Sequence, residues 1–479
     1  MFKHIVNYFL GKGLPGIINF LAIAIYTRLL TPDEYGIYAV IISIVTLINT
    51  TFFHWLRMGL LRFNPKYSGV DKLRFLSSIT CIFVSLQIFF ITAGIIVYFF
   101  IPNRNEILPF WILAIILLVM QSVFDIFTEY LRSELRSKTF GIIMVIKVTT
   151  SLVYSILFIN IGMGSNGIIL GLICGIFTSL ILILPKSLWG INTSLVDTRI
   201  IKEVIVYSLP FIAMLSMEAI IYSTDRFFIN WIQGAEATGL YSVSYDLAKQ
   251  ILMMIMIIIN LAAYPLVVKA LEQDGIEACR KQVKINTVYL LMFSVPAMIA
   301  MLILSGPITE NFLGKEFRNN AAPIFALITI GVFIQGIKFY YFDLAFQLGK
   351  NTKLQIVPVV LAAAANLFLN IILIPEYSFY GAAYSTIVSY ILSIVLSAYL
   401  GSKVFKLEFP IKEFAKITFA AVIMGVVLWR SLFYLYGFIG LMLQVLLGLI
   451  TYFIMMIILN IGNIQSLIVK FKSKITKSY

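Results

Sequence analysis

The chain has 479 residues, of which 61% are apolar and 12% charged, and its mean hydropathy is +0.98. Soluble domains have roughly 45–50% apolar and about 25% charged residues, so the composition excludes an ordinary soluble protein and indicates a multi-pass membrane protein. The formal net charge is +14. Because no soluble domain is left to carry a nucleic-acid surface, we attribute this charge to membrane topology and expect no nucleic-acid partner.

The cysteines and the N-terminus exclude further classes. Cys81, Cys174 and Cys279 are odd in number and two of them fall in apolar stretches, so neither a disulfide framework nor a metal site is expected. Residues 1–13 are followed by an apolar run without a small-residue cleavage site, which predicts a retained first span rather than a signal peptide. We expect no cofactor and no catalytic residue.

The apolar segments follow one another along the whole chain, and a spanning helix needs about 20 residues. This predicts an all-α polytopic membrane protein with about 14 transmembrane helices. The predicted segments are Leu14 to Leu30, Gly36 to Leu56, Phe75 to Ile101, Ile107 to Tyr130, Phe140 to Asn160, Ser165 to Leu184, Val204 to Ile232, Gly239 to Val268, Ile285 to Ser305, Ala321 to Leu348, Leu354 to Ile374, Phe379 to Ser402, Ile417 to Trp429 with its flanks, and Gly437 to Leu459.

The lysines and arginines alternate with these segments. With both termini on the cytoplasmic side, the loops assigned to the outside carry only Arg104, Lys315, Arg318 and Arg430, and the other loop cations are all cytoplasmic. Cytoplasmic loops are enriched in Lys and Arg, so the charges support this count and orientation.

A repeat divides the chain into two related halves. Arg28, followed by Gly36-Ile37-Tyr38, is echoed by Arg226, followed by Gly239-Leu240-Tyr241. The alignment of the halves also pairs Leu131 with Leu344 and Gly167 with Gly381. Six spans in each half give both copies the same orientation, which predicts a pseudo-twofold axis along the membrane normal.

The predicted domains follow from this repeat. They are an N-terminal six-helix lobe (1–185), a C-terminal six-helix lobe (200–403), an accessory helix pair (410–460) and a basic cytoplasmic tail (461–479).

Two motifs carry a family resemblance. RLLTPDEYGIY at residues 28–38 resembles the first-loop signature of the polysaccharide transporters, the Wzx-type oligosaccharide flippases of the multidrug/oligosaccharidyl-lipid/polysaccharide exporter superfamily. NLFLNIILIP at residues 366–375, followed by Gly381-Ala382-Ala383, is similar to the pattern of that family around spans eleven and twelve.

The resemblance implies a cargo and a location. It implies alternating-access transfer of an undecaprenyl-diphosphate-linked oligosaccharide from the cytoplasmic to the outer leaflet of a bacterial cytoplasmic membrane, for O-antigen, capsule or exopolysaccharide. The partners implied are the lipid-linked oligosaccharide, membrane lipids, a polysaccharide polymerase and glycosyltransferases. Such a chain is not an enzyme.

Ionisable residues inside the spans are the candidate site residues, because burying one costs roughly 3 kcal/mol and they should face a polar interior or each other. They are Arg28, Lys147, Arg226, Lys249, Lys338, Asp125, Glu218, Asp225, Asp246 and Asp343.

The cations among them are candidates for binding diphosphate or sugar. These substrate-binding candidates are Arg28, Arg226, Lys338 with Gln335 on the same helical face, and Lys147. Alternatively, Arg28 extends to the membrane interface and Lys338 forms a pair with Asp125 or Asp343.

Two carboxylates are candidates for ion coupling. Glu218 lies near the middle of span seven and Asp225 lies two turns later on the same face, with Tyr222 between them. Asp225 is also the natural partner of its neighbour Arg226.

Other polar and aromatic residues have structural explanations. Tyr38 and Tyr241 are expected in the aromatic belt at the outer interface. Asn366 and Asn370, four residues apart, are expected to hydrogen-bond to a neighbouring helix.

Three other functions remain open. A glycan polymerase is disfavoured by the lack of a long external loop, and no phosphate-binding Gly-x-x-x-x-Gly-Lys-Ser/Thr loop is present for nucleotide hydrolysis. A cation-coupled multidrug exporter of the same superfamily would usually lack spans thirteen and fourteen. A lipid II flippase would share the fourteen-span count and the interior arginines.

Overall fold

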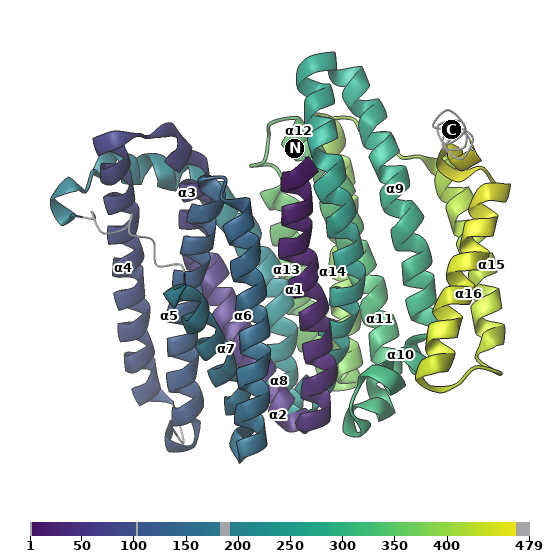
Figure 1. The fold of residues 1–479 in the computed structure, drawn as a ribbon, viewed down its shortest axis with the longest axis horizontal. Helices are drawn as coiled ribbons and strands as arrows, with labels where there is room; N and C mark the ends of the chain where they lie inside the picture. The colour runs from purple at the N-terminus through teal and green to yellow at the C-terminus, as the bar shows by residue number, and fades with distance from the viewer. Residues whose placement is uncertain (1, 102–103, 183–191, 466–479) are drawn as a thin grey trace, which may run out of the picture. The chain divides into compact units, whose positions relative to one another are not determined.

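The computed structural model describes residues 2–101, 104–182 and 192–465 (Figure 1). Regular structure in this part of the chain is helical, which confirms the predicted all-α class. The α-helices are α1 (Phe2–Leu29), α2 (Pro32–Ile48), α3 (His54–Phe63), α4 (Gly69–Phe100), α5 (Arg104–Ser133), α6 (Ser137–Phe158), α7 (Gly164–Ile181), α8 (Thr198–Asp274), α9 (Ile276–Ile303), α10 (Ser305–Phe312), α11 (Arg318–Ile337), α12 (Leu344–Leu348), α13 (Ile356–Tyr377), α14 (Phe379–Val404), α15 (Ile411–Ser431) and α16 (Gly437–Ile458).

Short 3-10 and π segments join or interrupt these helices. The 3-10 turns are η2 (Asn64–Lys66), η5 (Thr193–Leu195), η6 (Lys315–Phe317) and η8 (Ile461–Asn463). The π segments are η1 (Asn49–Phe53), η3 (Ile159–Met163) and η7 (Lys338–Phe342).

Ten helical stretches among the described residues are long and apolar enough to span a membrane. Two of them hold two predicted spans each, and each is broken at a glycine with positive φ, Gly162 (φ 89°) and Gly234 (φ 87°). Both breaks lie between predicted spans, where the sequence predicts loops. Glycine permits the break in each helix because it adopts positive φ without steric cost. The chain is therefore a multi-pass membrane protein.

The remaining predicted segments also fall in helices. The first lies in α1, whose apolar part is the shorter stretch Gly13–Leu29, and the thirteenth lies in α15. The last two residues of the predicted span Ser165 to Leu184, and residues 466–479 of the predicted tail, lie outside the described residues.

Packing divides the chain into two compact units. Unit 1 comprises residues 1–242 and 359–382, and unit 2 comprises residues 243–358 and 383–479, so that α8, α13 and α14 contribute to both. The lobes predicted from the repeat, 1–185 and 200–403, are a division by sequence relatedness and stay a prediction.

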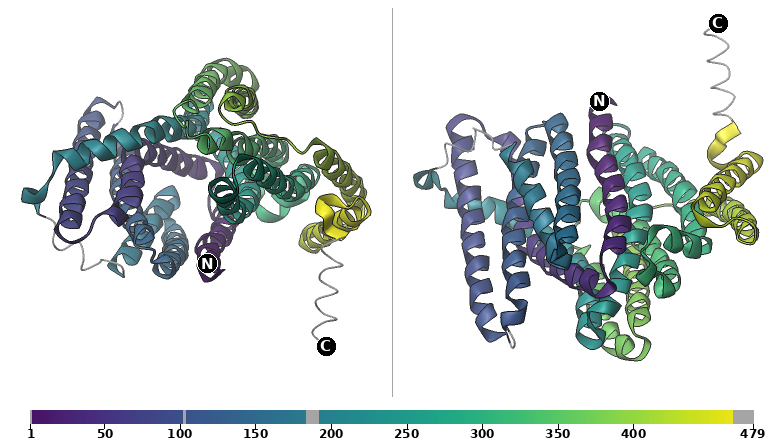
Figure 2. Two further views of the ribbon diagram at one scale, coloured as in Figure 1. Left: turned by 90° about the horizontal axis from the view of Figure 1, so that it is seen from above. Right: turned by 60° about the horizontal axis from the view of Figure 1, so that its bottom comes forward.

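In unit 1, α6 and α7 form a close antiparallel pair (Figure 1 and Figure 2). A Cβ atom on Gly171 or Gly175 would overlap Ser155 or Ser151 of α6, respectively. Small residues four apart on both helices let the backbones approach, which is how helices associate tightly in a membrane.

The two Gly-x-Tyr phrases of the repeat also meet in unit 1. A Cβ atom on Gly36 would overlap the carbonyl oxygen of Ala235, and one on Gly239 would overlap the carbonyl oxygen of Pro32. The first turns of α2 and of the second half of α8 are therefore in direct backbone contact.

The second repeated glycine has matching surroundings in its two copies. Gly167 packs against the backbone of Ile159 near the end of α6, and Gly381 packs against the backbone of Leu373 in α13. Ile159 and Leu373 each precede their glycine by eight residues, so the alignment of these two glycines is supported by equivalent helix hairpins.

One register of the predicted alignment is wrong. In the turns that follow α5 and α12, Leu135 (φ 56°) and Lys350 (φ 55°) both have a left-handed backbone conformation and the same pattern of backbone hydrogen bonds. The predicted alignment, which pairs Leu131 with Leu344, instead pairs Leu135 with Leu348. The structural match is thus two residues away from the predicted one. The π segment η7, which has no counterpart in the α-helical α5, accounts for one of these two residues, because a π turn inserts one extra residue.

In unit 2, α15 and α16 pack on α9. Gly425 of α15 faces Ile299 and Ile303 of α9, and the Tyr452 hydroxyl of α16 donates a hydrogen bond to the Met292 carbonyl of α9 at 2.9 Å. The C-terminal helix pair is thus held by small-residue packing and a buried hydrogen bond.

Candidate functional site

Asp225 of α8 is almost completely buried, at 1% exposure, and is surrounded by hydrogen-bond donors. The Tyr241 hydroxyl donates to Oδ2 at 2.6 Å, and the side-chain amides of Asn366 and Asn370 donate to Oδ1 at 3.1 and 2.8 Å. Three donors thus satisfy the acceptor oxygens of this side chain, because a buried polar group without partners is costly. All four residues belong to unit 1. We call these residues, with Arg226, the Asp225 cluster.

Arg226 lies next to Asp225 and is equally buried, at 1% exposure. Its guanidinium lies 4.4 Å from the centroid of the Tyr222 ring and donates from Nη1 to the Ser43 hydroxyl of α2 at 3.4 Å. The prediction that Arg226 has an interior position is confirmed by its burial. Its role in binding stays a prediction.

Two expectations about neighbouring residues have clear outcomes. Asn366 and Asn370 of α13 hydrogen-bond to α8, as predicted. The placement of Tyr241 in an interfacial aromatic belt is wrong, because the side chain is 1% exposed and its hydroxyl is bound to Asp225.

A second polar group in unit 1 surrounds Asp125 of α5. Arg57 of α3 forms an ion pair with Oδ2, which also accepts from the Asn49 amide at 2.8 Å, and Oδ1 accepts from the Gln121 amide at 2.7 Å. The Gln121 oxygen in turn accepts from Lys147 Nζ of α6 at 2.9 Å. These five residues form the Asp125 cluster.

The Asp125 cluster has unused hydrogen-bonding capacity. Arg57 Nε and Asn49 Oδ1 are buried, and neither has a hydrogen-bond partner within the described ranges 2–101, 104–182 and 192–465. Lys147 is partly buried, and its ammonium lies 4.5 Å from the centroid of the Phe124 ring. Two cations against one carboxylate leave this cluster with an excess of positive charge, which suits an anionic ligand.

Arg57 is a residue that the sequence reasoning missed. The predicted apolar segment ends at Leu56, which places Arg57 in the following cytoplasmic loop. In the structure the chain continues through η1 into α3, and Arg57 is 12% exposed. Arg57 lies three residues after His54, a spacing that places two polar side chains on one face of a helix next to an apolar segment, and this pattern could have indicated a buried site. In the structure His54 Nδ1 is 2.8 Å from Arg57 Nη2.

In unit 2, Lys338 and Asp343 form a buried ion pair. Lys338 Nζ is 3.0 Å from Asp343 Oδ2 across η7, and the two side chains are 1% and 3% exposed. Ser397 of α14 donates to Asp343 Oδ1 at 3.3 Å. The alternative prediction for Lys338, an ion pair with Asp125 or Asp343, is confirmed for Asp343.

The other candidates are more dispersed. Gln335, one turn before Lys338, donates its amide to the Tyr390 hydroxyl at 2.6 Å. Arg28 is exposed in the last turn of α1, where Nη1 donates to the Ala24 carbonyl at 2.7 Å. Glu218 is half-buried in α8, seven residues before Asp225. Their assigned roles stay predictions.

The fold and these clusters define a class of protein: a multi-pass α-helical membrane protein with ionisable side chains buried within its spans. Comparison with known sequences then gives the family. The chain belongs to the polysaccharide biosynthesis protein family, whose profile matches residues 25–322. This confirms the resemblance to the polysaccharide transporters.

A curated relative and solved structures agree with this assignment. The chain is 29% identical to the lipid II flippase MurJ of Thermosipho africanus (strain TCF52B) over 170 residues, 34% of each protein, so the match spans about a third of that relative. A structure of lipid II flippase MurJ in the inward closed conformation has a TM-score of 0.73 at 18% identity, covering 96% of this chain and 99% of that one.

The MATE transporters share the fold less completely. A structure of the MATE multidrug transporter DinF-BH has a TM-score of 0.60 at 15% identity and covers 85% of this chain and 96% of that one. At these identities, both structural likenesses concern the fold.

Proposed function

We propose that this protein is a flippase that transfers an undecaprenyl-diphosphate-linked oligosaccharide from the cytoplasmic to the outer leaflet for surface polysaccharide synthesis. It would act by alternating access in a bacterial cytoplasmic membrane, with both termini in the cytoplasm and with a polysaccharide polymerase and glycosyltransferases as partners. Family membership supports a place in polysaccharide biosynthesis, and the fold supports a carrier of this superfamily.

The observation that carries the proposal is the burial of two charged polar clusters within the spans of one compact unit. Hydrocarbon gives such groups no solvation, so a helical membrane protein that only anchored or scaffolded others would gain nothing from them. A carrier for a diphosphate and a polar glycan requires cations and hydrogen-bonding groups at this depth. The Asp125 cluster offers Arg57 and Lys147, and the Asp225 cluster offers Arg226.

We propose different roles for the cations and for the carboxylates. Arg226, Arg28, Lys147 and Lys338 with Gln335 are proposed to bind diphosphate or sugar. Glu218 and Asp225 are proposed to take up a proton or cation during the transport cycle. Asp225 suits this role because any change in its charge alters three hydrogen bonds and two helices.

Single neutralisation of the cations tests the proposal. Arg28→Gln, Arg226→Gln and Lys338→Gln should each reduce surface polysaccharide and leave lipid-linked oligosaccharide in the inner leaflet, at equal protein level in the membrane. Arg430→Gln, which removes an exposed arginine at the end of α15, is the matched control and should leave the polysaccharide unchanged. Normal polysaccharide in all three variants would overturn the assignment.

A lipid II flippase is the second candidate, favoured by the identity to MurJ over 170 residues. Vesicles containing the purified protein and either lipid II or an undecaprenyl-diphosphate oligosaccharide distinguish the two. Preferential transfer of lipid II would replace the proposed cargo by this one. A multidrug exporter is less favoured because the MATE structure covers less of the chain, and efflux of a cationic dye from the same vesicles tests it.

A further inference from the structure

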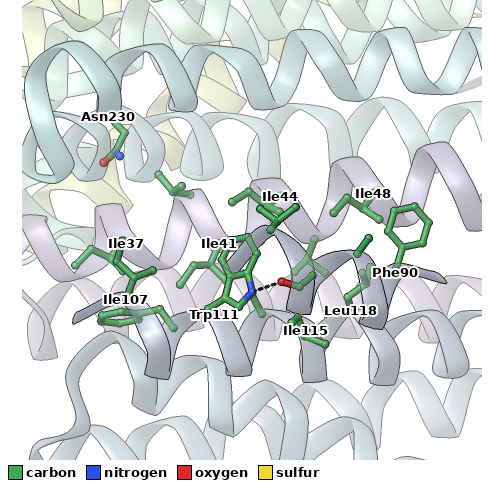
Figure 3. A pocket seen from close by; sticks show the side chains of 17 residues that line it. Ile37, Ile41, Ile44, Ile48, Phe90, Ile107, Trp111, Ile115, Leu118 and Asn230 are labelled. Atoms are coloured by element: carbon green, nitrogen blue, oxygen red, sulfur yellow. Dashed lines mark hydrogen bonds between the residues drawn. The ribbon is translucent and has the colours of Figure 1, made fainter. Parts of the chain in front are cut away.

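An apolar cavity of ≈ 660 Å³ lies in unit 1 between α2, α4 and α5, with one residue from α8 (Figure 3). Its volume is within the range of roughly 300–1,000 Å³ that ligand pockets have. The walls are aliphatic and aromatic, and among the lining residues only Asn230 carries a side-chain amide. The Trp111 indole N–H is already used, since it donates to the Gly94 carbonyl at 2.9 Å. The cavity therefore offers little to a polar ligand.

The cavity is elongated along the helices. Ile37 and Ile107 lie at one end and Ile48 and Leu118 at the other, as Figure 3 shows. Ile37 and Ile48 lie eleven residues apart on α2, and Ile107 and Leu118 lie eleven residues apart on α5. Eleven residues correspond to a rise of about 16 Å at 1.5 Å per residue. This shape fits a hydrocarbon chain better than a compact molecule.

Water and empty space are both poor occupants. Water stays out of a cavity that lacks polar partners, and an empty cavity of this size forfeits the dispersion contacts of all its lining side chains. Inside a membrane the apolar material at hand is lipid hydrocarbon. The cavity should therefore hold a lipid tail.

The end of the cavity at Ile48 and Leu118 adjoins the Asp125 cluster. Asn49 follows Ile48 directly, and Gln121 lies one turn after Leu118 on α5. The apolar cavity thus ends next to the Asp125 cluster, which has an excess of positive charge. This is the pattern expected for a lipid with an anionic head.

The depth of that cluster selects between two kinds of lipid. Lys147 lies near the middle of α6, and Asn49 lies in the interior of the apolar stretch Pro32–Lys66. Phospholipid head groups remain at the membrane surface, whereas the head of a lipid in transit passes through the interior.

We propose that the cavity between α2, α4 and α5 binds the isoprenoid tail of the carried polyprenyl-diphosphate lipid, with its head toward the Asp125 cluster. This inference rests on the proposed function and adds to it a site for the tail.

Photo-cross-linking of the full chain tests this site. The substitution Ile44→p-benzoylphenylalanine puts a probe in the cavity, and Ile116→p-benzoylphenylalanine puts one on an exposed face of α5, where Ile116 is 41% exposed. In vesicles of phosphatidylethanolamine and phosphatidylglycerol with a radiolabelled polyprenyl diphosphate, we expect several-fold more adduct at position 44 than at position 116. Equal adduct at the two positions would overturn the proposal.

Filling the cavity provides the second arm. Ala114→Trp, which occupies the cavity, should lower the adduct at position 44, whereas Ile112→Trp, on the exposed side of the same helix, should leave it unchanged. Radiolabelled phosphatidylglycerol should give little adduct at position 44. Equal labelling by phosphatidylglycerol would overturn the choice of an isoprenoid.

Transfer of the lipid-linked oligosaccharide is measured in the same vesicles, so the two proposals can fail separately. Transfer without enrichment of adduct at position 44 would overturn the tail site and support the flippase. Adduct at position 44 without transfer would support the tail site and overturn the flippase.

Discussion

Gly36 and Gly239 make reciprocal backbone contacts across the junction of α2 and α8. A Cβ atom on Gly36 would lie 3.0 Å from Gly239 N, and one on Gly239 would lie 3.1 Å from Gly36 N. The carbonyls that each would overlap belong to Ala235 and Pro32, and both precede the glycine of their own helix by four residues. Reciprocal contacts of this kind are what a twofold axis between two equivalent residues produces. The two copies of the repeated Gly-x-Tyr phrase are therefore in contact with each other in the structure.

Substitution of either glycine should destabilise the protein by a similar amount. Gly36→Ala and Gly239→Ala each force a methyl group into a backbone carbonyl, and overpacking of this kind costs about 1–3 kcal/mol. Thermal unfolding of the purified protein in detergent measures the loss. Gly306→Ala is the control, because no atom of the described residues outside its own helical turn lies within 4 Å of its Cβ position, and it should not lower the unfolding temperature. Unchanged unfolding of both variants would contradict the close contact.

Asp225→Asn should impair both stability and transport. The new amide retains one acceptor oxygen but presents an N–H group to a site where Tyr241, Asn366 and Asn370 are all donors. Loss of a buried charged acceptor costs about 1–3 kcal/mol. The exposed Asp33→Asn in the first turn of α2 is the control for carboxylate removal. Wild-type unfolding temperature and wild-type surface polysaccharide in Asp225→Asn would refute the role of the cluster.

A double-mutant cycle separates the structural and binding roles of Lys338. Lys338→Met and Asp343→Leu should each destabilise the protein by about 3–5 kcal/mol, because each leaves an uncompensated buried charge. The double variant should recover most of that loss. If it unfolds like the wild type but makes no surface polysaccharide, Lys338 takes part in transport. Full activity of the double variant would assign the pair a structural role alone.

Glu134 lies in the turn between α5 and α6, and it should make the free energy of unfolding depend on pH in the acid range. Burial raises the pKa of this carboxyl group, but hydrogen bonds from Lys72 at 2.7 Å and Asn64 at 2.6 Å outweigh it, and the net pKa is below its ordinary value. A group with a lowered folded-state pKa contributes stability above its unfolded pKa, about 4.3 for Glu, which is lost as the pH falls through the folded value.

Glu134→Gln should therefore be less stable than the wild type at neutral pH by up to about 1 kcal/mol, since the Lys72 pair is partly exposed. The difference should narrow as the pH falls below about 4. Unfolding temperatures of both proteins across this range check the sign. A gap between the two proteins that widens in acid would contradict the predicted pKa direction of Glu134.

The helices and their number follow from local patterns in the chain. Apolar runs, the glycine breaks at Gly162 and Gly234, and the distribution of lysine and arginine are each encoded within a few helical turns. Hydrocarbon also leaves the backbone no alternative to internal hydrogen bonds, so an apolar run of sufficient length has to be helical. The repeated glycines are also evident from the sequence, because each belongs to a short phrase that occurs twice in the chain.

Polar partners that lie far apart in the chain could not be predicted in this way. That Asn370 binds Asp225, and that Arg57 binds Asp125, depends on how α13 packs on α8 and α3 on α5, and these residues lie 145 and 68 positions apart in the chain. The π segments η1 and η7 also rotate the residues that follow them, which no apolar period reveals. Hydropathy reports the preference of a side chain for membrane or water. A buried charge, by contrast, is stabilised by whichever donors packing brings within about 3 Å, and that is a property of the folded chain.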